Sequence, residues 1–460
     1  MHGIVSFKLM NKSLLIRIII LILVISFFNS SFSQPTNLSF KQKTKIKIKL
    51  NKGNKRIFEN NYREALNIFR EVLSIDGDNP KANYKVGECQ YYLGKYKNAM
   101  KYIQKGYKLD KEVNDEIHYL LGATFHRLAK VDSAKKHYLT FDKKASNKTK
   151  EMYNLENLIK QCDFAKKLMS NPLKVTVENM GRKINTLSPE YSASITEDGK
   201  TIVFTSRRAD TKGGLTDLES DNLYYEDIYI SHFNDTTMEW SNAKPIEGKA
   251  NTEFHDAVLN ISPDGSYILV YKNDPSETKS GDIYISKKNE ETKKFGTPKP
   301  IDKGRNVNSS YFESSASTTS DGNTIFFVSD RTKGMGAADI YYATKIGANR
   351  WSEPVNLGDS INTELDEKCV FIHPNGKILF FTSQGHENMG GYDIFVSYRT
   401  NGIWSKAKNL GFPINTVKEE KTFSITKDGK TAYISAEYED SKGNSDIYKV
   451  DLSNLNILKP

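Results

Sequence analysis

The stretch TEDGKTIVFTS, residues 196–206, decides the fold of the second half of this chain. An Asp-Gly pair precedes a short apolar run, and Asp-Gly is a preferred pair in the primed turns of β-hairpins. The stretch therefore predicts a hairpin, and the same pattern recurs four more times. The five turns are Asp198-Gly199, Asp264-Gly265, Asp321-Gly322, Asn375-Gly376 and Asp428-Gly429.

Each hairpin is followed by a third strand that begins with Asp-Ile, then by an aromatic residue and a short fourth strand. The aspartates are Asp227, Asp282, Asp339, Asp393 and Asp446, and the aromatics are Trp240, Phe295, Trp351 and Trp404. We expect each Asp to cap its own glycine-rich loop and the aromatics to pack between layers. Four strands in a repeat of ~50 residues are typical of a β-propeller blade.

A second recurring phrase indicates how the ring closes. NLG-x-x-INT occurs at 356–363 and 409–416, and a near copy stands at 179–186, before the first hairpin. The last unit has no later copy of the phrase. We therefore expect the strand around Lys174–Asn179 to complete the last blade, which removes an unpaired sheet edge. The sequence predicts a five-bladed propeller over residues 173–460.

These blades resemble the WD40-like PD40 repeat that also occurs in TolB-type propellers. The resemblance rests on SPDG at 262–265 and on TEDGKTIVFTS. It implies the same all-β propeller fold.

The preceding segment, residues 41–170, has a helical repeat of 34 to 35 residues. Small residues recur at Gly53, Gly87 and Gly122, and each is followed twelve positions later by Ala65, Ala99 or Ala134. Small residues at these positions let paired helices approach closely. The pattern resembles the tetratricopeptide repeat, which implies an all-α superhelix, and Lys148–Met169 is expected to be one capping helix.

Arrays of this kind offer a concave groove lined by the first helix of each pair. By repeat phase, the candidate partner-binding residues are Asn54, Tyr84, Glu88, Tyr91, Tyr119, Ala123 and His126. The alternative is that the tyrosines pack between repeats. The carboxylate clamp of some family members is not expected, because Leu50, Glu116 and Leu120 occupy several of its positions.

The N-terminus has the pattern of a secretory signal peptide over residues 1–33. Lys8, Lys12 and Arg17 precede an apolar run at 18–28 that is shorter than the ~20 residues of a spanning helix. We expect cleavage, a periplasmic location and no transmembrane segment in the mature chain. Association with the outer membrane would then come through partners.

The net charge of +10 is divided unevenly along the chain. Residues 34–172 carry 29 basic and 15 acidic side chains, whereas residues 173–460 carry 34 and 41. An exported protein meets no chromosome, so we expect no nucleic-acid partner. The three cysteines, Cys89, Cys162 and Cys369, are expected to be isolated buried thiols, with a Cys89–Cys162 bridge as the alternative.

An acidic residue recurs before each first strand of the propeller. These residues are Glu190, Asp256, Glu313, Glu367 and Glu420. If they face the axial mouth, they would form a ring for a cation, a sugar or a basic partner. The alternative is that each accepts hydrogen bonds from the neighbouring blade's loop, since five unpaired carboxylates would repel one another. No catalytic motif is present, so we expect no enzyme, no metal and no cofactor.

The order of a signal peptide, tetratricopeptide repeats and a PD40 ring resembles the N-terminal part of OmpA-family envelope proteins of Bacteroidetes, including those linked to type IX secretion and gliding. No OmpA-like domain and no lipobox Cys are visible, so direct peptidoglycan binding is not expected. The resemblance implies a non-enzymatic periplasmic scaffold that binds envelope proteins. The alternative is a propeller that binds or cleaves glycans through its acidic ring.

Overall fold

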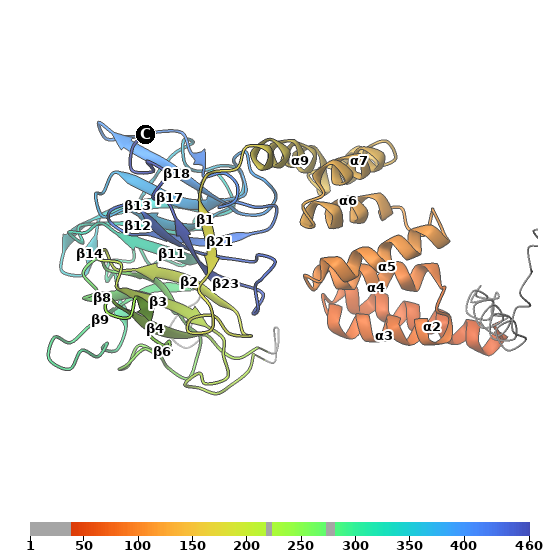
Figure 1. The fold of residues 1–460 in the computed structure, drawn as a ribbon, viewed down its shortest axis with the longest axis horizontal. Helices are drawn as coiled ribbons and strands as arrows, with labels where there is room; N and C mark the ends of the chain where they lie inside the picture. The colour runs from red at the N-terminus through yellow and green to blue at the C-terminus, as the bar shows by residue number, and fades with distance from the viewer. Residues whose placement is uncertain (1–37, 218–222, 273–280) are drawn as a thin grey trace, which may run out of the picture. The chain divides into compact units, whose positions relative to one another are not determined.

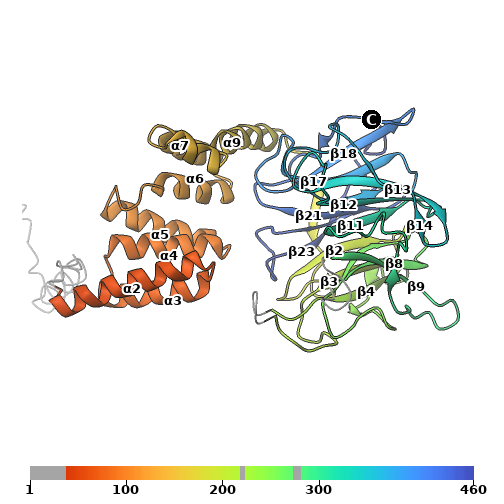
Figure 2. The same ribbon diagram turned by 180° about the vertical axis from the view of Figure 1, so that it is seen from behind.

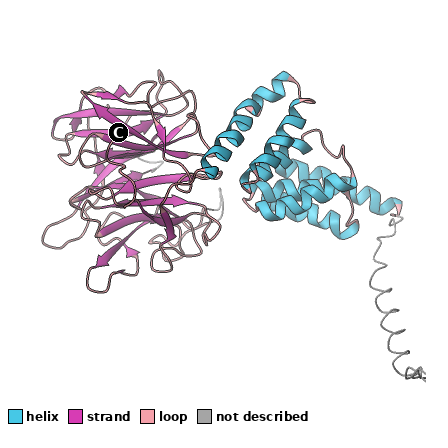
Figure 3. Ribbon diagram, turned by 45° about the horizontal axis from the view of Figure 1, so that its top comes forward, coloured by secondary structure: helices cyan, strands magenta, loops and turns pink. Residues whose placement is uncertain are grey.

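The computed structural model describes residues 38–217, 223–272 and 281–460, and the predicted signal peptide lies outside these ranges. The chain divides into two compact units, Met1–Ile117 and His118–Pro460. Helices form the N-terminal part and strands the remainder (Figure 3). Within the described ranges, no helix has the length and apolar character that crossing a bilayer requires.

The first unit consists of two antiparallel helix pairs (Figure 1). Its helices are α2 (Phe40–Phe58), α3 (Tyr62–Ile75), α4 (Pro80–Tyr92) and α5 (Tyr96–Leu109). A capping box between Ser39 and Gln42 begins α2. The side chain of Asn79 caps α4, which has Pro80 in its first turn.

The small residues of the repeat do allow close approach between paired helices. A Cβ added at Gly53 would lie 2.5 Å from the Phe69 ring, and one at Gly87 would lie 2.5 Å from the Ile103 side chain. The predicted packing of small against large side chains is therefore confirmed.

The second unit begins with the third helix pair and continues into the propeller. Its helices are α6 (Ile117–Arg127), α7 (Val131–Asp142), α8 (Asn147–Met152) and α9 (Leu155–Ser170). The prediction of one capping helix was wrong in detail. Asn154 has a left-handed backbone with φ of 46°, which separates the short α8 from α9.

Five antiparallel sheets follow in the described part of the second unit (Figure 2). Blade 1 contains β2 (Glu190–Ile195), β3 (Thr201–Ser206), β4 (Asp227–Asn234), β5 (Glu239–Trp240) and β6 (Lys244–Pro245). Blade 2 contains β7 (Asp256–Ile261), β8 (Tyr267–Lys272), β9 (Asp282–Lys287) and β10 (Lys299–Pro300). Blade 3 contains β11 (Glu313–Thr318), β12 (Thr324–Ser329), β13 (Asp339–Gly347), β14 (Arg350–Trp351) and β15 (Val355–Asn356). Blade 4 contains β16 (Glu367–Ile372), β17 (Ile378–Ser383), β18 (Asp393–Thr400), β19 (Ile403–Trp404) and β20 (Lys408–Asn409).

Blade 5 closes the ring as the sequence predicts. It contains β21 (Glu420–Ile425), β22 (Thr431–Ala436), β23 (Asp446–Asp451) and β1 (Thr176–Asn179), which pairs with β23. The innermost strands are β2, β7, β11, β16 and β21, and each contacts the next round the axis. The five-bladed propeller is thus confirmed.

The hairpin turns differ from the predicted primed type. Gly199 has a φ of 71°, but Asp198 does not have a positive φ, as a type I′ turn would require. Instead the N–H of Gly199 donates to the carbonyl of Thr196, 2.9 Å away. The glycine is therefore the left-handed residue of a turn whose preceding residue, Asp198, has a negative φ. The equivalent glycines of the other blades also have a positive φ.

Candidate functional site

The five recurring acidic residues are buried and do not face an open mouth. All five have 0 % exposure. Glu367 accepts hydrogen bonds from the backbone N–H and the hydroxyl of Thr363, at 3.0 and 2.9 Å, and from Ser383 at 2.7 Å. The other four accept the same pair of bonds from the residue four positions upstream, which is Thr186, Thr252, Ser309 or Thr416. This arrangement matches the structural alternative and contradicts an exposed acidic ring.

In the described part of the chain, arginines neutralise two of these carboxylates. Arg208 lies 3.0 Å from Glu190, and Arg331 lies 3.2 Å from Glu313. Glu367 has no such partner among the described residues, and burial raises its pKa to about 7. These groups hold the connections between blades together and are not presented to a ligand.

Four of the five aspartates that begin the third strands, Asp227, Asp339, Asp393 and Asp446, cap their loops as predicted, whereas the loop before Asp282 lies outside the described residues. Asp446 accepts from the backbone N–H groups of Lys442 and Gly443, both at 3.0 Å. Asp393 accepts from the N–H of Met389 at 2.9 Å. Trp240 contacts Tyr433 of blade 5, and Trp404 contacts Phe326 of blade 3, so these aromatics pack between blades.

The groove candidates of the first unit differ in accessibility. Asn54 is exposed, whereas Glu88 and Tyr91 are partly buried. The Glu88 carboxylate pairs with Lys85 at 2.7 Å. Tyr84 is only 2 % exposed, and its hydroxyl donates to Asn114 at 3.1 Å. Tyr84 is therefore a packing residue, as the alternative interpretation allowed.

The groove candidates in the third helix pair pack or form hydrogen bonds within the second unit. Tyr119 stacks on Tyr153 with ring centroids 4.0 Å apart, and Ala123 is buried. His126 is 4 % exposed, and its Nε2 donates to the carbonyl of Met389 at 2.8 Å. Burial lowers the pKa of His126 to about 4, so its ring is neutral near pH 7. The predicted role of His126 in partner binding was wrong, because its ring is buried against the propeller loop that contains Met389 and is not accessible to a partner.

Neighbouring groups complete this contact between the third helix pair and the propeller. Gln161 donates to the side chain of Asn388 at 2.7 Å, and Arg127 donates to the carbonyl of Val417 at 3.1 Å. Arg127 also lies 3.6 Å from the Glu419 carboxylate.

A group of tyrosines in the first unit forms an accessible aromatic surface. We call Tyr62, Tyr91, Tyr92 and Tyr96 the tyrosine cluster. The rings of Tyr62 and Tyr92 stack at 4.5 Å, and the ring of Tyr91 meets those of Tyr92 and Tyr96 at 5.4 and 5.5 Å. Tyr92 is 50 % exposed. Partial burial and the nearby Glu88 raise the pKa of Tyr92 to about 12, so its hydroxyl stays protonated.

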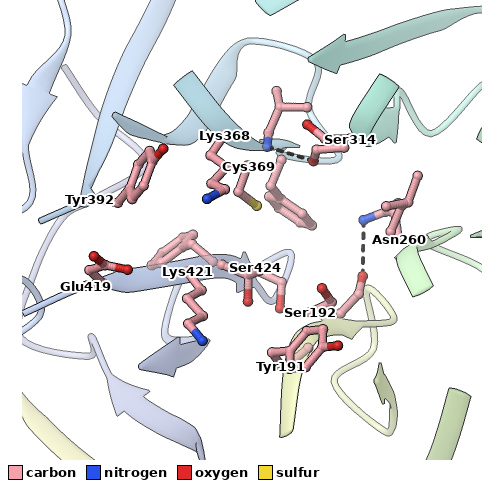
Figure 4. Close-up of a pocket in the computed structure, with 18 of the residues that line it drawn as sticks. Tyr191, Ser192, Asn260, Ser314, Lys368, Cys369, Tyr392, Glu419, Lys421 and Ser424 are labelled. Carbon is pink, nitrogen blue, oxygen red and sulfur yellow. Dashed lines mark hydrogen bonds between the residues drawn. The ribbon is translucent and has the colours of Figure 1, made fainter. Parts of the chain in front are cut away.

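The propeller also contains an axial cavity of about 360 Å³ between its innermost strands (Figure 4). The residue after each recurring acid lines this cavity or the adjoining hollow of about 390 Å³. These residues are Tyr191, Ala257, Ser314, Lys368 and Lys421. Successive side chains of a strand point to opposite faces, so a buried acid places the next side chain toward the axis.

Each innermost strand has a register shift close to the recurring acid. Such β-bulges change the direction of side chains next to binding sites. At the bulge of β2, Ser192 has a φ of 56°, which is the left-handed region. Sequence reasoning missed the cavity, because these bulges interrupt the regular alternation of side chains and have no sequence signal that we identified.

Metal ligands are not grouped in the parts of the chain that the structure describes, where no three His, Cys, Asp or Glu could hold an ion together. The cysteines Cys89, Cys162 and Cys369 are all free, so the alternative of a Cys89–Cys162 bridge was wrong.

Comparison with known proteins gives a match for the helical part. Residues 59–141 match the family described as anaphase-promoting complex, cyclosome, subunit 3. No curated protein matches the chain. The tetratricopeptide nature of the helical repeat agrees with this family match.

Several solved structures are similar to part of the chain. The second tetratricopeptide domain of human RPAP3, in complex with an HSP70 peptide, is 18 % identical with a TM-score of 0.23, and the match covers 25 % of this chain and 97 % of that one. The first such domain of Spaghetti (RPAP3), bound to an HSP90 peptide, is 22 % identical with a TM-score of 0.23, covering 25 % and 90 %. The Yersinia enterocolitica type III secretion chaperone SycD, in complex with a peptide of the translocator YopD, is 13 % identical with a TM-score of 0.24, covering 28 % and 98 %.

Proposed function

We propose that this protein is a non-enzymatic adaptor of the bacterial cell envelope that binds a protein partner through the tyrosine cluster of its first unit. The observation that carries this proposal is the accessible aromatic surface around Tyr92, next to the Lys85–Glu88 ion pair. Tyrosine is enriched at binding hot spots because its large ring contacts a partner at low entropic cost.

The location of this adaptor is a further part of the proposal. The pattern of residues 1–33 supports export, and the order of the repeats supports a role in the periplasm, in envelope machinery of the secretion or gliding type. Partners of this adaptor are proteins rather than nucleic acids. Attachment to peptidoglycan is not part of its proposed role.

Affinity purification from cell envelopes after crosslinking tests the proposal. We expect a stoichiometric partner with the unaltered chain and at least about a tenfold loss of that partner with Tyr92→Ala. Leu109→Ala is the matched control, because Leu109 is a similarly exposed apolar residue of the same unit, at 44 %. Recovery of no partner, or equal recovery with both variants, would contradict the proposal.

A further inference from the structure

The axial cavity contains two lysines whose charge is not neutralised by an ion pair. Lys368 of β16 and Lys421 of β21 lie on neighbouring innermost strands (Figure 4). Neither forms a salt bridge within the described residues. Their ammonium groups lie instead near aromatic faces, with Lys368 Nζ 4.5 Å from the Tyr392 ring centroid and Lys421 Nζ 5.9 Å from that of Tyr191.

The surroundings of Lys421 oppose its charge. Partial desolvation in the cavity lowers the pKa of Lys421, although its side chain stays accessible from the cavity, and the charge of Lys368 lowers it further. Glu419 and Glu437 act in the opposite direction. Both acids also have other cationic neighbours, since Glu419 lies near Arg127 and Glu437 lies near Lys418. The cavity therefore has a local excess of positive charge.

A buried hydroxyl without a partner also lines this cavity. Ser424 is 1 % exposed, and its Oγ has no hydrogen-bond partner among the residues that the structure describes. A buried polar atom left in this state costs about 1–3 kcal/mol, so native proteins rarely keep one without a reason. A ligand that accepts a hydrogen bond from Ser424 would remove this cost.

The remaining walls are suited to an apolar body. Val370, Phe371 and Phe423 line the cavity beside the polar groups. A volume of about 360 Å³ lies at the lower end of the range for small-molecule sites.

We propose that the axial cavity binds a small organic anion, with its carboxylate or phosphate group held by Lys368 and Lys421 and its apolar body against Phe371 and Phe423. Ser424 donates a hydrogen bond to the bound anion. This site goes beyond the proposed adaptor role and does not depend on it, because the tyrosine cluster lies in the other unit.

Calorimetric titration of the full-length mature protein tests the site. The probes are benzoate, phenyl phosphate and the neutral benzamide, which matches benzoate in shape. We expect one or both anions to bind at millimolar concentration and benzamide to bind at least about tenfold more weakly. The preferred probe distinguishes a carboxylate ligand from a phosphate ligand.

Three variants and a control locate the binding. Lys368→Gln and Lys421→Gln should each weaken anion binding about tenfold or more, and Ser424→Ala about threefold to tenfold. Lys406→Gln removes the same charge from an exposed position between β19 and β20 and should leave binding unchanged. Failure of both anions to bind would overturn the proposal, and so would equal affinity for benzamide or affinities that the two cavity lysine variants leave unchanged. Thermal melts show that each variant is folded.

Discussion

Five buried asparagines tie each blade to the connection that leaves it. The side chain of Asn415 accepts from the N–H of Ile394 and donates to its carbonyl, both at 2.8 Å. In each of the other blades, an equivalent asparagine forms the same two bonds with the equivalent residue of the third strand. These asparagines are Asn185, Asn251, Asn308 and Asn362. The amide oxygen of this side chain thus replaces a missing strand acceptor for the N–H, which explains why Asn recurs in the INT phrase.

Asn415→Ala should lower the free energy of unfolding of the propeller by about 1–3 kcal/mol, because it leaves the buried N–H of Ile394 without a partner, whereas the carbonyl of Ile394 still accepts from the N–H of Leu410. Chemical denaturation followed by circular dichroism measures this change. Asn242→Ala is the control, since Asn242 is exposed. Equal stability of the two variants would show that Asn415 does not hold its blade.

Gly87→Ala should destabilise the first unit by about 1–3 kcal/mol. The added Cβ would lie 2.5 Å from the Ile103 side chain and 2.8 Å from its backbone nitrogen, so α4 and α5 would have to separate. Thermal unfolding of this variant is compared with that of Gly77→Ala, where the nearest atom is 3.7 Å away. The prediction fails if both variants melt at the same temperature.

At the scale of single residues, the sequence predicted packing better than binding. The contact of Gly53 with Phe69 follows from repeat phase alone. The hydrogen bond of His126 to Met389 joins residues far apart in the chain, so repeat phase could not reveal it. The cavity residues Lys368 and Lys421 were missed because the residue that follows the recurring acid has a different chemical character in different blades, so it forms no visible repeat.

At the scale of elements, the first and third strands of the blades bring several carboxyl groups into the interior. Burial raises the pKa of Asp227 to about 7, as it does for Glu367. An unfolded carboxyl titrates near pH 4, so the folded state keeps protons between about pH 4 and 7 that the unfolded state has lost. These groups therefore lower stability as the pH rises through that interval. Buried histidines such as His126 act in the opposite direction, since their pKa is lowered.

Glu367→Gln isolates one carboxyl from these opposing contributions. At about pH 5, Gln should cost stability, because its amide replaces an acceptor that faces the N–H of Thr363. The difference in free energy of unfolding between this variant and the unaltered protein should be smaller by about 1–3 kcal/mol at about pH 8, because the native carboxyl has to ionise inside the blade there. Denaturation curves at the two pH values measure it. A difference that grows with pH would mean that Glu367 is stabilised as an anion.

The elements themselves could be predicted wherever a pattern repeated. The Asp-Gly pairs identified the hairpins, but the turn type depends on the φ of Asp198, which residue identity does not determine. The break at Asn154 was missed because no Gly or Pro marks the end of α8. The bulges beside the recurring acids have no sequence signal that we identified, so the direction of the axial side chains could not be derived.

At the scale of the whole molecule, the pairing of β1 with β23 joins residues from opposite ends of the propeller. Val177 of β1 lies opposite Val450 of β23. The number of blades and the closing strand could be predicted, because the INT phrase occurs once before the first hairpin and is missing after the last. The axial cavity could not, since it forms only when all five blades are present.

A disulfide between these strands should strengthen the ring. In the double variant Val177→Cys and Val450→Cys, oxidation closes a loop that contains nearly all of the propeller, which should stabilise the fold by about 2–4 kcal/mol. Melting curves with and without reductant measure the difference, and Val177→Cys alone is the control. A reductant effect no larger than that of the single variant would contradict the pairing.

The connections between blades that contain the INT phrase or its counterparts also determine how the propeller can open. Each connection is bonded through its Asn to the blade it leaves and through the following Thr or Ser to the acid of the next blade, as with Asn415 and Thr416. In an open repeat array, units can fray one by one from the ends. Here each blade is fastened to both neighbours and the ring has no end, so amide hydrogens in the central strands of all five blades should exchange with one common free energy of opening.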